Sequence, residues 1–178
     1  MATPVIAFAQ LATECEKDGL TPKNGEKIAA ELAKTFGVKD DEVGILRVDK
    51  SSLVFVYPAK LHNIGTIPLN TTGSVAARTF NTKRAEIINN FAQAKHTSIF
   101  EAVDTGSRPK PAPGEKVDKH AYVIQKLMSV PVMSQAGPVG VIQVCRKGMT
   151  APASGPDFSP ADLQKLVTIC QALSKCFK

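Results

Sequence analysis

Polar side chains placed in otherwise apolar stretches are the residues of this 178-residue chain most able to do chemistry. Val139, Val141 and Gln143 alternate along the sequence with apolar residues on the other side of the same run, and Ser129 and Gln125 interrupt a neighbouring run. An amide or hydroxyl that is taken out of water must find a partner. Gln143 therefore hydrogen-bonds inside the protein, lies at a dimer seam or binds a ligand.

Thiols are the other reactive groups, and their spacing argues against catalysis. The four cysteines form no CxxC pair and have no metal-ligand spacing to the three histidines: Cys15, Cys145, Cys170 and Cys176. They are best interpreted as buried thiols. Cys176, near the end of the chain, is expected to be the reactive one. Since no GxSxG, HExxH or P-loop motif is present, we predict no catalytic residue, no metal site and no cofactor.

The overall charge gives little support to a nucleic-acid surface. The chain has a net charge of +6 and a pI near 9.2, but its basic residues are scattered, there is no tryptophan, and aromatic residues make up only 6%. A solvated basic surface is the preferred interpretation. No apolar run approaches the roughly 20 residues of a membrane span, and the first residues lack the features of a signal peptide. We expect a cytoplasmic protein without membrane contact.

The C-terminal half contains the clearest structural signals. Two runs rich in valine and isoleucine flank Ser134–Pro138, which predicts an antiparallel hairpin whose second strand is apolar on both faces and therefore central in its sheet. A helix begins after Phe158, because Ser159 can cap it, Pro160 suits its first position and Asp162 completes a capping box.

The N-terminal half predicts two helices followed by a sheet. Pro4 and Pro22 open helices that end near residues 18 and 36. Further elements are expected in the order strand, strand, strand, helix, weak strand, helical piece and surface loop: 43–49, 53–57, 64–69, 74–80, 85–89, 92–103 and 104–118. We expect one domain over residues 1–178, with a helical extension at 1–20 and a core at 22–177.

The strand, glycine turn, GVIQV strand and FSPADLQKL helix together resemble the C-terminal half of GAF domains, and the resemblance runs over about residues 28–177. It implies an α/β (α+β) fold. In this fold a central antiparallel sheet of five or six strands has the N- and C-terminal helices on one face, and short helices and loops cover a pocket on the other. It also implies a homodimer that pairs through the terminal helices.

The resemblance places the pocket against residues 69–103, so polar groups there and on the central strands become the ligand-binding candidates: Thr71, Ser74, Arg78, Asn89, Asn90, His96, Ser129 and Gln143. Each has a structural alternative. Thr71 and Ser74 suit helix caps, Asn89 and Asn90 suit a turn, and His96 can be an ordinary histidine. Arg78 either clamps a carboxylate or phosphate, or is solvated.

Departures from known GAF subclasses narrow the function. The spaced residues of cyclic-nucleotide binders cannot be placed, and no Cys-His dipeptide is present for a bilin. Free methionine sulfoxide reductases need a nucleophilic and a resolving thiol, but no cysteine lies between Cys15 and Cys145. We therefore expect a non-catalytic sensory or regulatory domain that binds an unidentified small polar or anionic molecule. The alternatives are a dimerisation scaffold with a filled pocket and, less favoured, the reductase.

Overall fold

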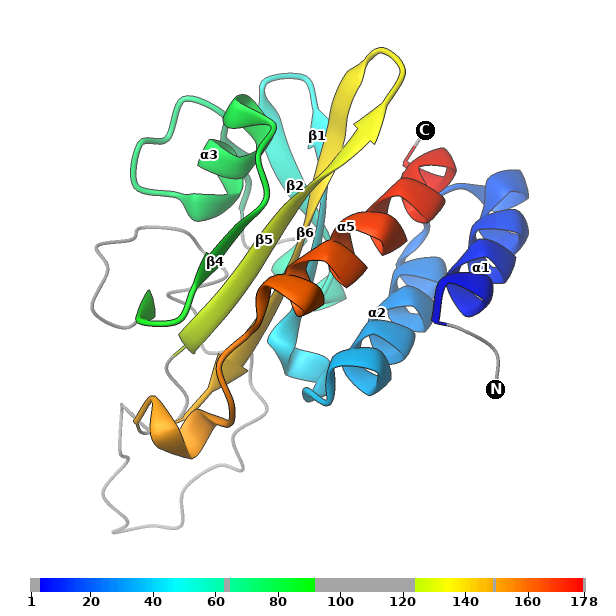
Figure 1. Cartoon of the computed structure of the whole chain (residues 1–178). Helices are drawn as coiled ribbons and strands as arrows, with labels where there is room; N and C mark the ends of the chain where they lie inside the picture. The colour runs from blue at the N-terminus through cyan, green and yellow to red at the C-terminus, as the bar shows by residue number, and fades with distance from the viewer. Residues whose placement is uncertain (1–3, 63–64, 92–123, 149, 178) are drawn as a thin grey trace, which may run out of the picture.

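A six-stranded antiparallel sheet with helices on both faces organises the chain (Figure 1). The computed structural model describes residues 4–62, 65–91, 124–148 and 150–177. The strands run in the order β3-β2-β1-β6-β5-β4. Their bounds are β1 Val43–Asp49, β2 Ser52–Tyr57, β3 Ile67–Pro68, β4 Glu86–Ile88, β5 Ile124–Ser134 and β6 Gly137–Lys147. The predicted antiparallel sheet, with its terminal helices on one face, is confirmed.

The hairpin β5–β6 forms the centre of this sheet. Strand β6 pairs with β5 on one side and with β1 on the other, as expected for a strand that is apolar on both faces. Residues alternate along β6, so Ile142 and Val144 face the terminal helices while Val141 and Cys145 face the opposite side. The strand therefore joins two separate apolar cores.

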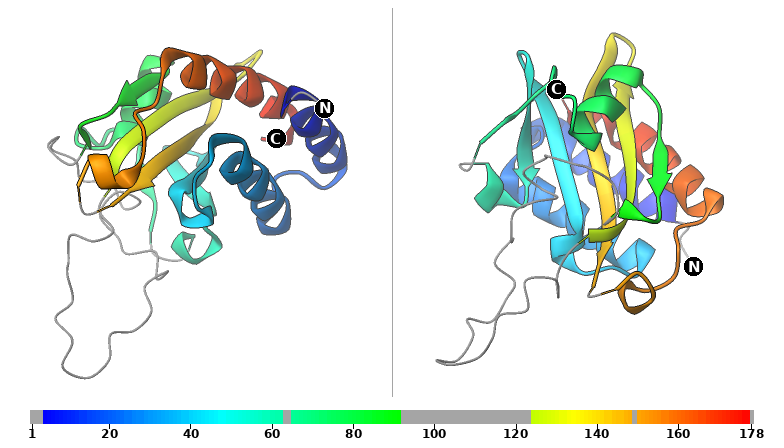
Figure 2. Two further views of the ribbon diagram at one scale, coloured as in Figure 1. Left: turned by 60° about the horizontal axis from the view of Figure 1, so that its bottom comes forward. Right: turned by 90° about the vertical axis from the view of Figure 1, so that its left-hand side faces the viewer.

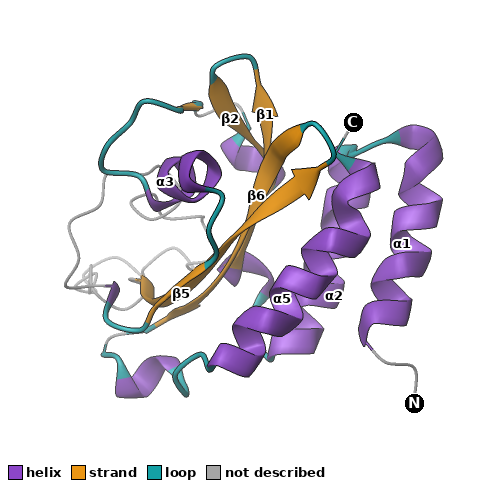
Figure 3. Cartoon of the chain, turned by 45° about the horizontal axis from the view of Figure 1, so that its top comes forward, coloured by secondary structure: helices purple, strands orange, loops and turns teal. Residues whose placement is uncertain are grey.

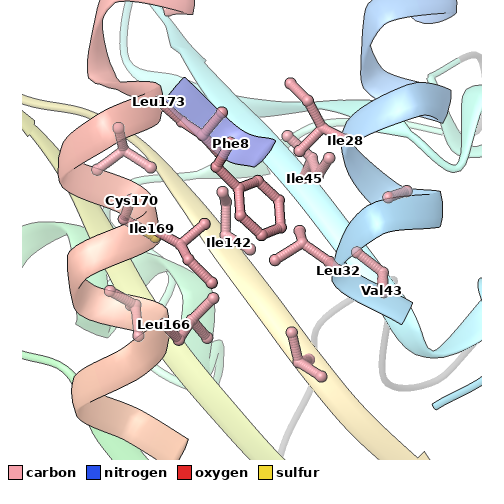
Figure 4. Packing of buried hydrophobic residues seen from close by; sticks show 14 of the residues in the cluster. Phe8, Ile28, Leu32, Val43, Ile45, Ile142, Leu166, Ile169, Cys170 and Leu173 are labelled. Carbon is pink, nitrogen blue, oxygen red and sulfur yellow. The ribbon is translucent and has the colours of Figure 1, made fainter. Parts of the chain in front are cut away.

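Helices α1 Pro4–Asp18, α2 Pro22–Phe36 and α5 Pro160–Leu173 lie on one face of the sheet (Figure 2). Local sequence fixes their ends. The hydroxyl of Thr21 accepts from the Asn24 N–H at 3.2 Å, and the Asp162 N–H donates to the Ser159 hydroxyl at 3.1 Å. Figure 4 shows Phe8 of α1 between the apolar side chains of α5 and α2. The three helices therefore share one core with the sheet.

The opposite face of the sheet packs against helix α3 Val75–Thr82, and we call it the α3 face (Figure 3). Apolar side chains cover it, among them Leu46, Phe55, Phe80, Phe91 and Leu127. The predicted helical piece at 92–103 and loop at 104–118 lie outside the described residues.

The other regular elements in the described part of the chain are short 3-10 turns: η1 Asp40–Glu42, η2 Ala59–Leu61, η4 Pro152–Ser154 and η5 Ser174–Cys176. The edge strands are shorter than the sequence predicts. β3 ends at Pro68, which has no N–H to continue a ladder. Within the described ranges, none of the helices combines the length and the apolar character needed to cross a bilayer.

Candidate ligand-binding site

Gln143 lies at the centre of the α3 face and is fully buried, with a relative exposure of 0%. Ser129 of β5 is its cross-strand partner on one side, and Gly44 of β1 is its partner on the other. The Gln143 Nε2 group donates to the Ser129 Oγ at 3.2 Å. Because Gly44 has no side chain, this position of β1 supplies no side-chain partner for the amide.

A chain of hydrogen bonds leads from Ser129 to the surface. The Ser129 Oγ lies 2.7 Å from the Thr79 Oγ1 of helix α3, and the Thr79 Oγ1 lies 3.4 Å from the Glu86 Oε1 of strand β4. The Glu86 carboxylate in turn accepts from the Arg78 Nε at 3.1 Å and from its Nη2 at 2.9 Å. We call Gln143, Ser129, Thr79 and Glu86 the polar relay. It ties the buried amide to an ion pair at the protein surface.

One end of the polar relay is left unsatisfied. The Gln143 Oε1 is buried and accepts no hydrogen bond from the part of the chain that the structure describes. A buried acceptor without a partner costs about 1–3 kcal/mol of folding free energy. Gln125, on the neighbouring strand β5, differs from Gln143 in that its Nε2 donates to a backbone carbonyl, that of Gly148, at 3.0 Å. The relay therefore presents a lone acceptor on the α3 face.

Two predicted candidates occupy the turn before α3. Ser74 is fully buried and caps the helix, its hydroxyl accepting from the Ala77 N–H at 3.2 Å. Thr71 is half-buried, and its N–H donates to the Pro68 carbonyl at 3.0 Å. The placement of Ser74 matches the structural alternative that the sequence offered, a helix cap. Thr71 lies in a backbone turn before α3 and does not cap the helix.

Arg78 lies on the solvent side of α3, where 49% of its side chain is exposed. Its guanidinium holds Glu86 through two hydrogen bonds. A ligand carboxylate would have to compete with Glu86 for the Arg78 guanidinium, because Glu86 already binds it. Arg78 instead anchors the outer end of the polar relay.

Asn89 and Asn90 follow strand β4 and have different surroundings. Asn89 forms two hydrogen bonds with the backbone of Phe158: its Nδ2 donates to the carbonyl at 3.1 Å, and its Oδ1 accepts from the N–H at 3.0 Å. Asn90 is exposed. His96 lies outside the described residues. Asn89 thus fastens β4 to the segment that begins α5.

Thr79 and Glu86 are the relay members that sequence reasoning missed. Thr79 lies one helical turn after Val75, on the buried side of α3, so a polar residue on an apolar stripe was the available signal. Glu86 gave no such signal, because a single glutamate on a weak strand looks like ordinary surface. Only the pairing of Glu86 with Ser129 across β4 and β5 brings it to the relay.

The thiols divide between the two cores. Cys145 lies on the α3 face, whereas Cys15, Cys170 and Cys176 pack among the terminal helices. Burial raises the pKa of Cys15 and of Cys170, and it raises that of Cys176 to about 12. The expected reactivity of Cys176 is wrong, because this thiol is buried against α1, with its Sγ 3.8 Å from the Ala12 carbonyl.

A sequence model of the GAF domain matches residues 25–177. This chain belongs to the GAF domain family. A search of curated proteins finds no match. Among solved structures, the chain is similar to the GAF domain of an Acinetobacter phosphoenolpyruvate-protein phosphotransferase, with a TM-score of 0.64 at 14% identity over 99% of this chain and 94% of that one.

Proteins with reductase activity share the same fold. The reduced form of fRMsr from Staphylococcus aureus aligns with a TM-score of 0.58 at 15% identity, covering 100% of both chains. The type II free methionine-R-sulfoxide reductase of Thermoplasma acidophilum aligns with a TM-score of 0.57 at 13% identity, covering 94% of each chain. Similarities at identities this low show a common GAF fold. The function must therefore be argued from the residues of the site.

Proposed function

We propose that this GAF domain is a non-catalytic sensor that binds a small polar molecule against its α3 face. The observation that carries the proposal is the Gln143 Oε1, a fully buried acceptor with no partner among the described residues. Buried polar groups in folded proteins are nearly always satisfied, and a ligand is one way to satisfy this one. Gly44, opposite Gln143 on β1, contributes no side chain that could satisfy this oxygen.

Strand β4 offers a route from this site to the terminal helices. Glu86 at its start belongs to the polar relay, and Asn89 just after its end holds the backbone of Phe158. Phe158 directly precedes Ser159, the residue that caps α5. A ligand that shifts the relay would therefore displace β4 and bias the start of α5, which is a population shift between two packings of the helical layer.

Thiol placement favours sensing over reduction of free methionine sulfoxide. Such a reaction needs a nucleophilic thiol and a resolving thiol close together beside the bound substrate. Cys145 lies on the α3 face, while the other three cysteines of the sequence lie in the opposite core. The sheet separates the two sets. We therefore propose that the domain is not an enzyme.

Pairing of two copies through the terminal helices is part of the proposal. The side chain of Ile6 on α1 is 49% exposed and would be covered in such a dimer. Light scattering of wild type and Ile6→Lys tests it: the wild type should have twice the mass of one chain, and the variant should be monomeric. The cytoplasmic location stays a prediction from the sequence.

A thermal-shift screen of amino acids, nucleosides and other metabolites tests the proposed function, with Gln143→Met as the variant and Gln125→Met as its matched control. A ligand of the α3 face should raise the melting temperature of wild type and of Gln125→Met, but much less that of Gln143→Met. No shift in wild type across the panel would favour a scaffold with a filled pocket. Thiol-dependent turnover of free methionine sulfoxide would instead favour the reductase.

A further inference from the structure

The hydrogen bonds of the polar relay all donate in the same sense along the chain of residues. This sense is set by Glu86, at the surface end of the relay. The Glu86 carboxylate pairs with the Arg78 guanidinium, so it is ionised and can only accept hydrogen bonds. Thr79 has a single hydroxyl hydrogen. With its Oγ1 facing the Glu86 Oε1 at 3.4 Å, that hydrogen is directed to the carboxylate.

Each following hydroxyl is then constrained in turn. Since Thr79 has used its hydrogen, it accepts from Ser129 across the 2.7 Å contact. Ser129 has now donated as well, so it accepts from Gln143, which is the sense of the 3.2 Å bond from the Gln143 Nε2. The amide nitrogen therefore points to Ser129, and the amide oxygen is the group left over.

The reverse direction is disfavoured by the same carboxylate. If Ser129 donated to the Gln143 oxygen, Thr79 would have to give its hydrogen to Ser129. The lone pairs of the Thr79 oxygen would then face the negatively charged Glu86 with no hydrogen between them. The ion pair of Arg78 and Glu86 thus selects one of the two amide orientations.

From this we infer that the ligand group that meets Gln143 is a hydrogen-bond donor, such as a ring or amide N–H, and not a carboxylate or phosphate. The inference rests on the proposed function, since it names the chemistry of that same site. An anion placed there would face the amide oxygen of Gln143, which repels negative charge. The nearby Arg78 guanidinium already pairs with Glu86. Of the polar or anionic molecule expected from the sequence, this inference keeps the neutral polar class.

Removing the Thr79 hydroxyl should reverse the orientation of the Gln143 side-chain amide. Valine has nearly the shape of threonine but has no hydroxyl. In Thr79→Val the Ser129 hydrogen is released and can donate to the Gln143 oxygen, so the amide flips and presents its N–H instead. Thr82→Val is the matched control, because the Thr82 hydroxyl lies on the same helix, is exposed and donates to the Arg78 carbonyl at 2.8 Å.

Nuclear magnetic resonance tests the orientation without any ligand. In wild type and Thr82→Val, the side-chain amide protons of Gln143 should show nuclear Overhauser contacts to the β-protons of Ser129. These contacts should weaken or vanish in Thr79→Val. Strong contacts that persist unchanged in Thr79→Val, or contacts absent from wild type, would overturn the inference and leave the proposed sensor standing.

Indole and benzofuran test the ligand class, because they share one shape and only indole has an N–H donor. One hydrogen bond predicts that wild type binds indole about threefold to tenfold more tightly than benzofuran, measured by calorimetry. The preference should persist in Thr82→Val and disappear in Thr79→Val. Equal or stronger binding of benzofuran by wild type overturns the inference. If the amide orientation is as inferred but neither these two compounds nor any member of the metabolite panel binds, the proposed function fails and takes the ligand class with it.

Discussion

Two buried glutamines on neighbouring strands should respond in opposite ways to the same substitution. Methionine is unbranched like glutamine and close to it in volume, but it has no amide. Gln143→Met removes an unpaired acceptor, worth about 1–3 kcal/mol, and loses one bond to Ser129, worth about 0.5–1.5 kcal/mol. The expected net effect is a stabilisation of about 1 kcal/mol. Gln125→Met loses only its bond to the Gly148 carbonyl and should destabilise by about 1 kcal/mol.

Urea unfolding measures both variants against wild type in the absence of added small molecules. Equal m-values would show that the denatured states are comparable. For a protein of this size, about 1 kcal/mol corresponds to a rise of about 2–4 °C in melting temperature for Gln143→Met. A loss of 1 kcal/mol or more in Gln143→Met would show instead that the Gln143 oxygen has a partner that contributes to stability. A gain in stability together with a lost ligand response would mark Gln143 as a residue kept for function.

Three further substitutions test the framework around the site. Gly140→Ala should destabilise by about 1–3 kcal/mol in urea unfolding, because a Cβ there would lie 2.3 Å from the Leu46 carbonyl and 2.6 Å from the Phe177 ring; a loss below about 0.5 kcal/mol would contradict this packing. Asn89→Ala should cost about 1–3 kcal/mol and raise amide exchange at the start of α5, whereas the exposed Asn90→Ala should change little; equal effects would deny the link to Phe158. The pKa of Cys176 rises from 9.0 to about 12 in the folded state, so above pH 9 the unfolded chain releases a thiol proton that the folded chain keeps. Stability should therefore fall from pH 9 towards 12, less steeply in Cys176→Ala, and equal slopes in denaturation series would contradict this.

Local sequence signals were sufficient wherever neighbouring residues determine the structure. The capping residues Thr21 and Ser159 start α2 and α5 where expected, and Gly37 ends α2 with a left-handed φ of +62°. The hairpin β5–β6 follows from its two apolar runs and the turn between them. In each case a few adjacent residues contain the whole signal.

Details of burial were harder to predict because they depend on distant partners. Along α5, Leu163 is only half-buried, while Ile169 is fully buried. Cys176 looked accessible from its place near the chain end, yet helix α1 covers it. Neither result follows from helical spacing alone, since both depend on how α1 packs against α5.

The candidate site was predicted in part. Ser129 and Gln143 stood out as polar residues on apolar strands, and the structure places them side by side in register. The relay beyond them joins α3 and β4, which are close in sequence, to β5, which follows more than thirty residues later. Arg78 was singled out for its charge, but its partner Glu86 became visible only once β4 was paired. Spacing in the sequence gives no information on such long-range contacts.

A crystal structure of the protein purified without additives would show whether the α3 face holds a ligand. We predict density for a small molecule on this face, with a donor atom about 3 Å from the Gln143 Oε1. A protein side chain or backbone N–H donating to that oxygen, with solid packing around it and no bound molecule, would rule out the proposed sensor site.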